Sequence, residues 1–259
     1  MLDEGHLIGL DYGSESARGV LVEVVSGAVV ASHMHSYTHS VLSSALPAGT
    51  KLLAGWALQD ASDHEEAAAE ILGALGRGSR VRGIGLGCTA SSPLPTTADG
   101  TPLSRLHPGV PHAYAKLWKH AAAQAQADRI NSRGGDHLAD VGGRLSANSL
   151  LAKAAEMAEE APALWAEAER FIEAGDWLAW RLTGRETRSA AFAAYKADWR
   201  AGFGYPADAV PGLGAKLGEV RPVGTAAGAL TPAWRERTGN GGDAVKFRSR
   251  EPAEYFVTV

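Results

Sequence analysis

The sequence contains a single cysteine, Cys88, among 259 residues. One thiol excludes an internal disulfide and a cysteine-type metal site. No stretch approaches the roughly 18 apolar residues of a membrane span, and the opening residues are acidic where a secretory signal is basic. An excess of positive charge is also missing, because the formal net charge is −4. We therefore expect a cytoplasmic protein that binds neither nucleic acid nor membranes; the sequence leaves its oligomeric state open.

The first half of the sequence has the pattern of a mixed sheet. Three short apolar runs, at 7–10, 18–25 and 29–33, are joined by tight turns, which favours an antiparallel meander. A helix is expected next, with Ser62 and Glu65 forming a capping box at its start. Residues 80–89 then have the composition of a buried strand.

Two prolines, Pro93 and Pro95, are expected to end that strand, and residues 98–101 (ADGT) are typical of a hairpin turn. The rest is dominated by helical patterns, at 113–131, 146–160 and 163–182, the last ending at Thr183-Gly184. The sequence thus predicts an α/β fold, in which a mixed sheet with an antiparallel opening meander is flanked by helices.

The segment after the first apolar run carries the clearest chemistry. A strand that ends in Asp11 and turns through Gly13 places one carboxylate beside free backbone amides, which can hold phosphate oxygens. Ser14 and Ser16 add hydroxyl donors. The carboxylate would repel phosphate unless a Mg²⁺ ion lay between them, and Mg²⁺ keeps most of its waters, so that Asp11 alone would suit it. The alternative is an ordinary β-turn in which Asp and Gly serve only the turn geometry.

The sequence GLDYGSESARGVLV at residues 9–22 resembles the first phosphate-binding motif of the FGGY carbohydrate kinases. Further segments resemble those of the ribulokinase branch of this family in the same order, at 56–60, 87–93, 117–120, 173–177, 182–184 and 194–199. The resemblance implies a ribonuclease-H-like lobe of the actin/hexokinase ATPase type. It implies an amino-terminal lobe at 1–238, a divergent tail at 239–259 whose order or disorder the sequence leaves open, and no carboxy-terminal lobe.

The resemblance also implies a reaction, the ATP- and Mg²⁺-dependent phosphorylation of a ketopentose such as ribulose in arabinose catabolism. Asp11, Gly13, Ser14 and Ser16 would bind the nucleotide phosphates, and Asp11 would hold the Mg²⁺ through water. The sugar would contact the residues at matching positions, which are Ala90, Ser91, Trp118, Lys119 and Lys196. Core packing of the tryptophan and solvation of both lysines remain the alternatives.

Two departures from the family weaken the expectation of activity. Gly87 stands where ribulokinases commonly have an aspartate, and the aspartate that acts as general base in the family would belong to the second lobe. Asp243 lacks the family context of that base. We therefore expect no catalytic residue and no turnover in this chain alone, unless a second lobe is supplied in trans. A non-catalytic sugar-binding module and an actin-like or chaperone-like ATPase lobe are the alternative functions.

Other residues have a mainly structural interpretation. His33, His35 and His39 could suggest zinc, but no third ligand with suitable spacing follows, and the face of an edge strand explains these histidines better. Cys88 has no general base nearby in sequence and is expected to be a small buried side chain. Asp176, beside Trp177, is expected to anchor neighbouring backbone.

Overall fold

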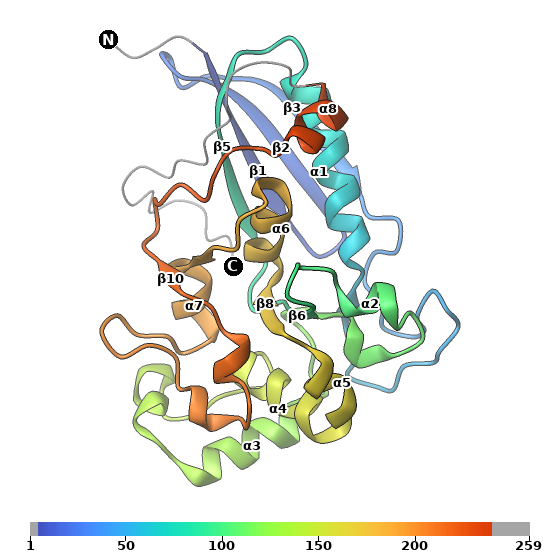
Figure 1. Cartoon of the computed structure of the whole chain (residues 1–259), viewed down its shortest axis with the longest axis vertical. Helices are drawn as coiled ribbons and strands as arrows, with labels where there is room; N and C mark the ends of the chain where they lie inside the picture. The colour runs from blue at the N-terminus through green and yellow to red at the C-terminus, as the bar shows by residue number, and fades with distance from the viewer. Residues whose placement is uncertain (1–4, 240–259) are drawn as a thin grey trace.

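The computed structural model describes residues 5–239 (Figure 1). Apart from Gly239, the expected tail at 239–259 lies outside the described residues. The molecule has an upper part built on one sheet and a lower part made mainly of short helices (Figure 1). In the described part of the chain, no helix is both long and apolar enough to cross a bilayer.

The upper sheet has four strands in the order β3-β2-β1-β5. Strands β1 (His6–Tyr12), β2 (Ser16–Glu23) and β3 (Val29–Ser36) form the antiparallel meander that the sequence predicts. Strand β5 (Val81–Cys88) runs parallel to β1 on its other side, so that Asp11 lies opposite Gly87. The carboxyl ends of β1 and β5 therefore meet at one edge of the sheet.

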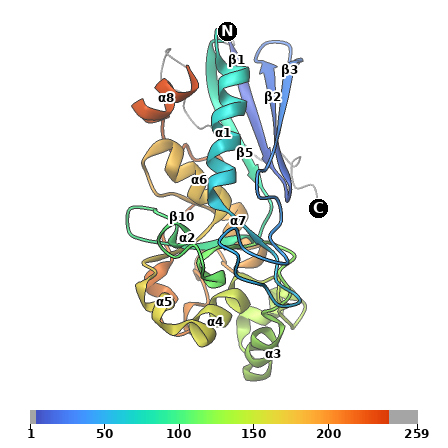
Figure 2. The same ribbon diagram turned by 90° about the vertical axis from the view of Figure 1, so that its right-hand side faces the viewer.

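Helix α1 (Ala61–Gly76) lies along one face of this sheet, with α6 (Ala174–Thr183) and α8 (Pro232–Thr238) on the same side (Figure 2). Its apolar residues Ile71 and Leu75 approach β2 so closely that a Cβ at Gly19 would be 2.2 Å from the Ile71 side chain. Glycine at this position therefore permits the close helix–sheet packing.

The expected capping box of α1 is wrong. The N-cap is Asp60, whose Oδ1 accepts hydrogen bonds from the Ser62 amide (2.9 Å) and the Ser62 hydroxyl (2.7 Å). Glu65 instead forms ion pairs with Arg105 and Arg181. An aspartate in extended conformation before the helix satisfies the free amides, and this leaves the glutamate available for tertiary contacts.

The lower part contains three two-stranded sheets. Strand β4 (Leu58–Gln59) pairs with β7 (Ala115–Lys116), β6 (Pro93–Thr96) with β8 (Arg170–Glu173), and β9 (Arg188–Ser189) with β10 (Val220–Arg221). Pro93 and Pro95 therefore do not end the strand before them as expected, because β5 already ends at Cys88 and both prolines lie inside β6. A strand paired on only one side tolerates residues without an amide hydrogen.

The helices of the lower part are shorter than their sequence patterns predict. The pattern at 113–131 is helical only from Gln124 onward, because β7 and a loop occupy its first part. The pattern at 163–182 is divided by β8, and the helix after it ends at Gly184, with φ +70°, as expected. The α-helices after α1 are α2 (Leu103–Leu106), α3 (Gln124–Arg133), α4 (Leu150–Glu160), α5 (Pro162–Glu167), α6 (Ala174–Thr183), α7 (Ala190–Lys196) and α8 (Pro232–Thr238).

Two apolar cores stabilise these parts. The first lies between the sheet and helices α1, α6 and α8, and Trp177 is fully buried in it. The second lies among α3, α4 and α5 and includes Leu151 and Phe171. The edge where β1 and β5 end lies between the two parts (Figure 1), and Asp11 lies at this edge opposite Gly87.

Candidate functional site

The turn between β1 and β2 presents Asp11 and the two residues that follow Gly13. Asp11 is exposed, and among the described residues its carboxylate has no hydrogen-bond or ion-pair partner. The turn is closed by a hydrogen bond from the Gly13 amide to the Ser16 carbonyl (2.9 Å). The amides of Ser14 and Glu15 make no hydrogen bond within the described residues, so that they are available to an anion.

Side chains from distant segments hold the other side of this turn. The Gln59 amide donates to the carbonyls of Gly13 (3.2 Å) and Ser14 (2.9 Å), and the Tyr37 hydroxyl also donates to Gly13 (3.2 Å). These bonds satisfy the carbonyls and fix the direction of the peptide planes. We call residues 11–16 the anion loop.

Trp118 is joined directly to the anion loop. Its indole nitrogen donates to the Ser14 hydroxyl at 3.0 Å, although the two residues are 104 positions apart in sequence. The ring is 39% exposed, so that one part packs against the protein and another part faces solvent. Lys119 is exposed and has no hydrogen-bond or ion-pair partner among the described residues, so no contact brings it to the loop.

A buried charged cluster fixes the segment that carries Trp118. The Glu156 carboxylate accepts from Lys116 (2.7 Å) and from His120 Nε2 (3.0 Å), and all three side chains are fully buried. His120 Nδ1 accepts from the Ala57 amide at 3.2 Å. The neutral ring therefore carries its proton on Nε2 and donates it to Glu156.

Burial alone would raise the pKa of Glu156, but the hydrogen bond from His120 and the charge of Lys116 lower it to about 2. Lys116 also donates to His112 Nδ1 (3.1 Å) and lies 4.6 Å from the Trp56 ring centroid. Burial and the Lys116 charge lower the pKa of His112 to about 3. The cluster is thus one carboxylate and one ammonium, surrounded by neutral rings.

Sequence reasoning missed this cluster. Its signal was present in residues 150–160, where Lys153 and Glu156 interrupt the alanine-rich buried face of a helix. Charged residues at helical spacing on a face that should be apolar indicate buried partners, because an unpaired buried charge is too costly.

The loop after β5 starts beside the anion loop, since the Thr89 amide donates to the Tyr12 carbonyl at 3.0 Å. The loop continues through Ala90, which is partly exposed, and the Ala90–Ser91 peptide bond is cis. The Ser91 hydroxyl is fully buried and donates to Glu173 (2.7 Å). Ser91 therefore supports the loop from within, whereas Ala90 reaches the surface.

Glu173 and Lys153 bind this loop from beneath. Glu173 also accepts from the Ser92 amide (2.6 Å), and the Lys153 ammonium donates to the Ser91 carbonyl (2.6 Å). Burial lowers the pKa of Lys153 to about 7, against the attraction of Glu173.

Lys196 is the last residue of α7 and is partly buried, with its ammonium 5.1 Å from the Tyr195 ring centroid. Burial lowers its pKa, and the attraction of Glu173 opposes this effect. The structure thus links Lys196 electrostatically to the carboxylate beneath the Ala90 loop.

Other residues considered from sequence have structural contacts. Asp176 accepts from the Ser189 amide (2.9 Å), as its expected anchoring role requires. Burial raises the pKa of the Cys88 thiol, so that it stays protonated and is no nucleophile. His33 and His35 lie on the edge strand β3, and His39 is bonded to Asp63 at 2.8 Å. Within residues 5–239, no three His, Cys, Asp or Glu side chains form a metal-binding group.

Gly87 borders the anion loop. A Cβ at this position would lie 3.9 Å from Asp11 Oδ1. An aspartate at this position would therefore stand beside Asp11.

Sequence comparison finds relatives among curated proteins, although no family model matches the chain. The ribulokinase of Shouchella clausii is 38% identical over 90% of this chain and 46% of its own length. The ribulokinase of Halalkalibacterium halodurans is 35% identical over 93% of this chain and 47% of its own length. The ribulokinase of Mycolicibacterium smegmatis is 40% identical over 74% of this chain and 36% of its own length. The chain thus spans about half the length of the curated relatives it matches, or less, and corresponds to their amino-terminal part.

Solved structures give the same fold. A gluconate kinase from Lactobacillus acidophilus superposes with a TM-score of 0.75 at 16% identity, covering 95% of this chain and 47% of the kinase. A xylulose kinase from the same organism superposes with a TM-score of 0.74 at 16% identity, covering 94% of this chain and 47% of the kinase. At these identities the likeness establishes the fold alone: these sugar kinases share the α/β fold of this chain, in which a mixed sheet is flanked by helices as the sequence predicts.

Proposed function

We propose that this chain, which has the sequence and the fold of an amino-terminal lobe of the FGGY carbohydrate kinases and is similar to ribulokinases, serves the ATP-dependent phosphorylation of a ketopentose. The proposed acceptor is the 5-hydroxyl of ribulose. The observation that carries the proposal is the anion loop, with its unpartnered Asp11 carboxylate and the free amides of Ser14 and Glu15. We also propose that residues 1–238 act as one lobe. The cytoplasmic location expected from the sequence stays a prediction.

The loop residues fit a magnesium-bound nucleotide. A single exposed carboxylate suits Mg²⁺, which retains most of its waters, and the amides of Ser14 and Glu15 suit phosphate oxygens. Bound Mg²⁺ would supply charge neutralisation at the phosphates. In our proposal Asp11 holds the ion through water, Gly13 keeps the turn tight, and Ser14 and Ser16 offer hydroxyls to the phosphates.

The sugar would lie against Ala90, Trp118 and Lys196. The exposed part of the Trp118 ring offers an apolar surface for a sugar face, and the Lys196 ammonium offers donors to hydroxyls. Ser91 contributes by fixing the Ala90 backbone through Glu173. Lys119 stays a candidate as an exposed cation beside Trp118.

We assign no general base to this chain. Phosphoryl transfer depends on positioning and charge stabilisation from both sides of the reacting groups, in a site closed to water. A single lobe leaves its bound phosphates in solvent, where Coulomb attraction is weak. The isolated 259-residue chain is therefore expected to give no turnover with Mg·ATP and ribulose, as measured by ADP release.

Calorimetry separates the possible functions. The chain is expected to bind Mg·ATP, and Asp11→Asn should weaken that binding about tenfold, the effect of about 1.4 kcal/mol that a charge-assisted contact supplies. Glu159→Gln, which removes an exposed ion pair with Arg129, is the matched control and should change nothing.

Other outcomes point elsewhere. Ribulose binding without any Mg·ATP binding would support a non-catalytic sugar-binding module. Mg·ATP hydrolysis without sugar would support an actin-like or chaperone-like ATPase lobe. Equal affinities for wild type and Asp11→Asn would contradict the assigned role of the anion loop. If the chain alone is inactive, addition of a second lobe in trans is expected to restore turnover.

A further inference from the structure

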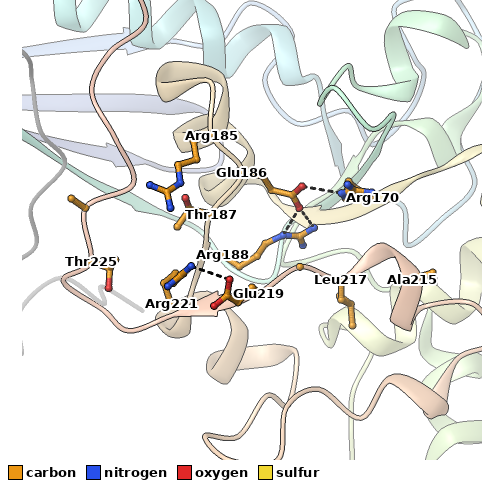
Figure 3. Close-up of a pocket in the computed structure, with 12 residues that line it drawn as sticks. Arg170, Arg185, Glu186, Thr187, Arg188, Ala215, Leu217, Glu219, Arg221 and Thr225 are labelled. Carbon is orange, nitrogen blue, oxygen red and sulfur yellow. Dashed lines mark hydrogen bonds and ion pairs between the residues drawn. The ribbon is translucent and has the colours of Figure 1, made fainter.

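A polar cavity of about 430 Å³ lies beside the β9–β10 pair (Figure 3). None of its lining residues belongs to the anion loop, and none is Ala90, Trp118 or Lys196. Four arginines and two glutamates line it, which leaves an excess of two positive charges. A concave site with this excess attracts small anions, although the whole chain has a net charge of −4.

Two of the arginines are committed to the fold. The Arg188 side chain is 3% exposed and donates to Glu186 (2.9 Å), to the Phe171 carbonyl (2.9 Å) and to the Lys216 carbonyl (3.2 Å). Arg170 donates to the other oxygen of Glu186 at 2.9 Å. Burial opposes ionisation of Glu186, but the hydrogen bonds from both arginines outweigh it and lower its pKa. Two guanidinium groups thus share one carboxylate in the wall of the cavity, and one of the two excess positive charges lies there.

The other two arginines remain available. Arg185 is exposed, and its guanidinium has no partner among the described residues. Within residues 5–239, Arg221 pairs only with Glu219, two residues away, and that carboxylate is 72% exposed. Such an exposed pair stabilises little, so Arg221 can exchange this partner for another anion at small cost.

Two hydroxyl groups complete the arrangement. Thr187 and Thr225 line the same cavity, and their side chains make no hydrogen bond within residues 5–239. Figure 3 shows Arg185, Thr187, Arg221 and Thr225 grouped on one side of the cavity, away from the Arg170–Glu186–Arg188 cluster. Two guanidinium groups with two hydroxyl donors match an anion with several oxygens better than a single carboxylate.

We propose that Arg185, Arg221, Thr187 and Thr225 bind the phosphate group of a small phosphate monoester. The cavity volume accommodates a phosphate with a short carbon chain, and the exposed mouth lets it enter from solvent. The site does not depend on the proposed kinase function, because no residue is shared with the anion loop. It adjoins that function in one respect, since β9 leads directly into α7, which ends at Lys196.

Calorimetric titration with glycerol 3-phosphate at low ionic strength tests this site, with glycerol as the uncharged comparison. We expect binding of glycerol 3-phosphate and none of glycerol. The double variant Arg185→Gln/Arg221→Gln should lose at least about tenfold in affinity, because two charged hydrogen-bond donors are removed. Both arginines are exposed, so the variant should keep the wild-type melting temperature in the absence of ligand.

Two further variants make the test specific. Arg144→Gln removes another exposed arginine, which pairs with Asp128 of α3, and should leave the affinity unchanged. Ser14→Ala alters the anion loop and should also leave it unchanged. Unchanged affinity in the double variant would overturn the proposal, and so would an equal loss in Arg144→Gln. A loss in Ser14→Ala would instead assign the phosphate to the anion loop and overturn the second site. Sulfate that binds as tightly as glycerol 3-phosphate would reject phosphate monoesters as the ligand class.

Discussion

At the scale of single residues, Glu156 determines where Trp118 lies. Lys116 and His120 stand two positions before and after Trp118, and both are bound to the same buried carboxylate. A buried ion pair contributes little net stability compared with apolar side chains of similar size. Its clearest effect here is geometric, since it fixes both ends of the segment whose central residue donates to Ser14.

The variant Glu156→Gln is expected to destabilise the protein by about 3 kcal/mol or more, because it leaves the Lys116 ammonium buried without a counter-charge. The double variant Lys116→Met/Glu156→Gln should recover most of this loss. Urea unfolding measures both effects. If Trp118 depends on the cluster for its position, its indole N–H should exchange faster with solvent in the folded double variant than in wild type. An unchanged exchange rate would show that packing alone positions Trp118.

Single residues also mark how far sequence reasoning reaches. Asp11, Gly13 and Ser14 could be proposed from one turn, because the strand, the carboxylate and the glycine are neighbours in sequence. The contacts of Gln59 and Trp118 with Ser14 could not be predicted, because no local pattern indicates a hydrogen bond between residues 45 or 104 positions apart in sequence. Whether the loop residues bind phosphate stays a prediction.

At the scale of elements, local patterns failed where long-range pairing decided the structure. Residues 163–182 have apolar residues at helical spacing, yet Arg170–Glu173 forms β8 because it pairs with β6. Strand preference depends strongly on the partner, which a single segment does not reveal. The opening meander was predicted correctly because each of its strands pairs with the next one along the chain.

The start of α1 provides a test at this scale. Asp60→Ala removes the acceptor for both the amide and the hydroxyl of Ser62 and should cost about 1 kcal/mol. For a domain of this size the melting temperature should fall by about 2–4 °C. Ser62→Ala keeps the hydrogen bond from the backbone amide of residue 62 to Asp60 and should therefore lower the stability less than Asp60→Ala. A larger effect in Ser62→Ala would restore the capping box predicted from sequence.

At the scale of the whole molecule, pH should change stability through buried histidines. His64 is 2% exposed, its Nε2 has no hydrogen-bond partner among the described residues, and its ring contacts those of Tyr12 and Tyr37. Burial lowers its pKa to about 4. The unfolded chain therefore binds a proton below pH 6.5 that the folded chain refuses until about pH 4.

Stability contributed by His64 is thus complete above pH 6.5 and is lost as the pH falls toward 4. The expected loss is about 1.4 kcal/mol per pH unit in this range. His64→Phe removes the titration, so that its unfolding free energy should fall less steeply than that of wild type between pH 6.5 and 4.5 in urea titrations. Parallel curves for the two proteins would contradict the assignment to His64. His112 stays in both proteins and therefore contributes equally to both slopes.

The anion loop has one further consequence, which concerns the order of events during synthesis. The loop lies at residues 11–16, but residues 37 and 59 hold its backbone. Trp118 contacts the Ser14 hydroxyl, and Glu156 holds the segment that carries Trp118. A growing polypeptide that has just left the ribosome would contain the whole loop long before its last support is translated. The anion loop therefore reaches its final geometry late, and nascent chains shorter than about 156 residues would contain the loop sequence without the contacts that hold it.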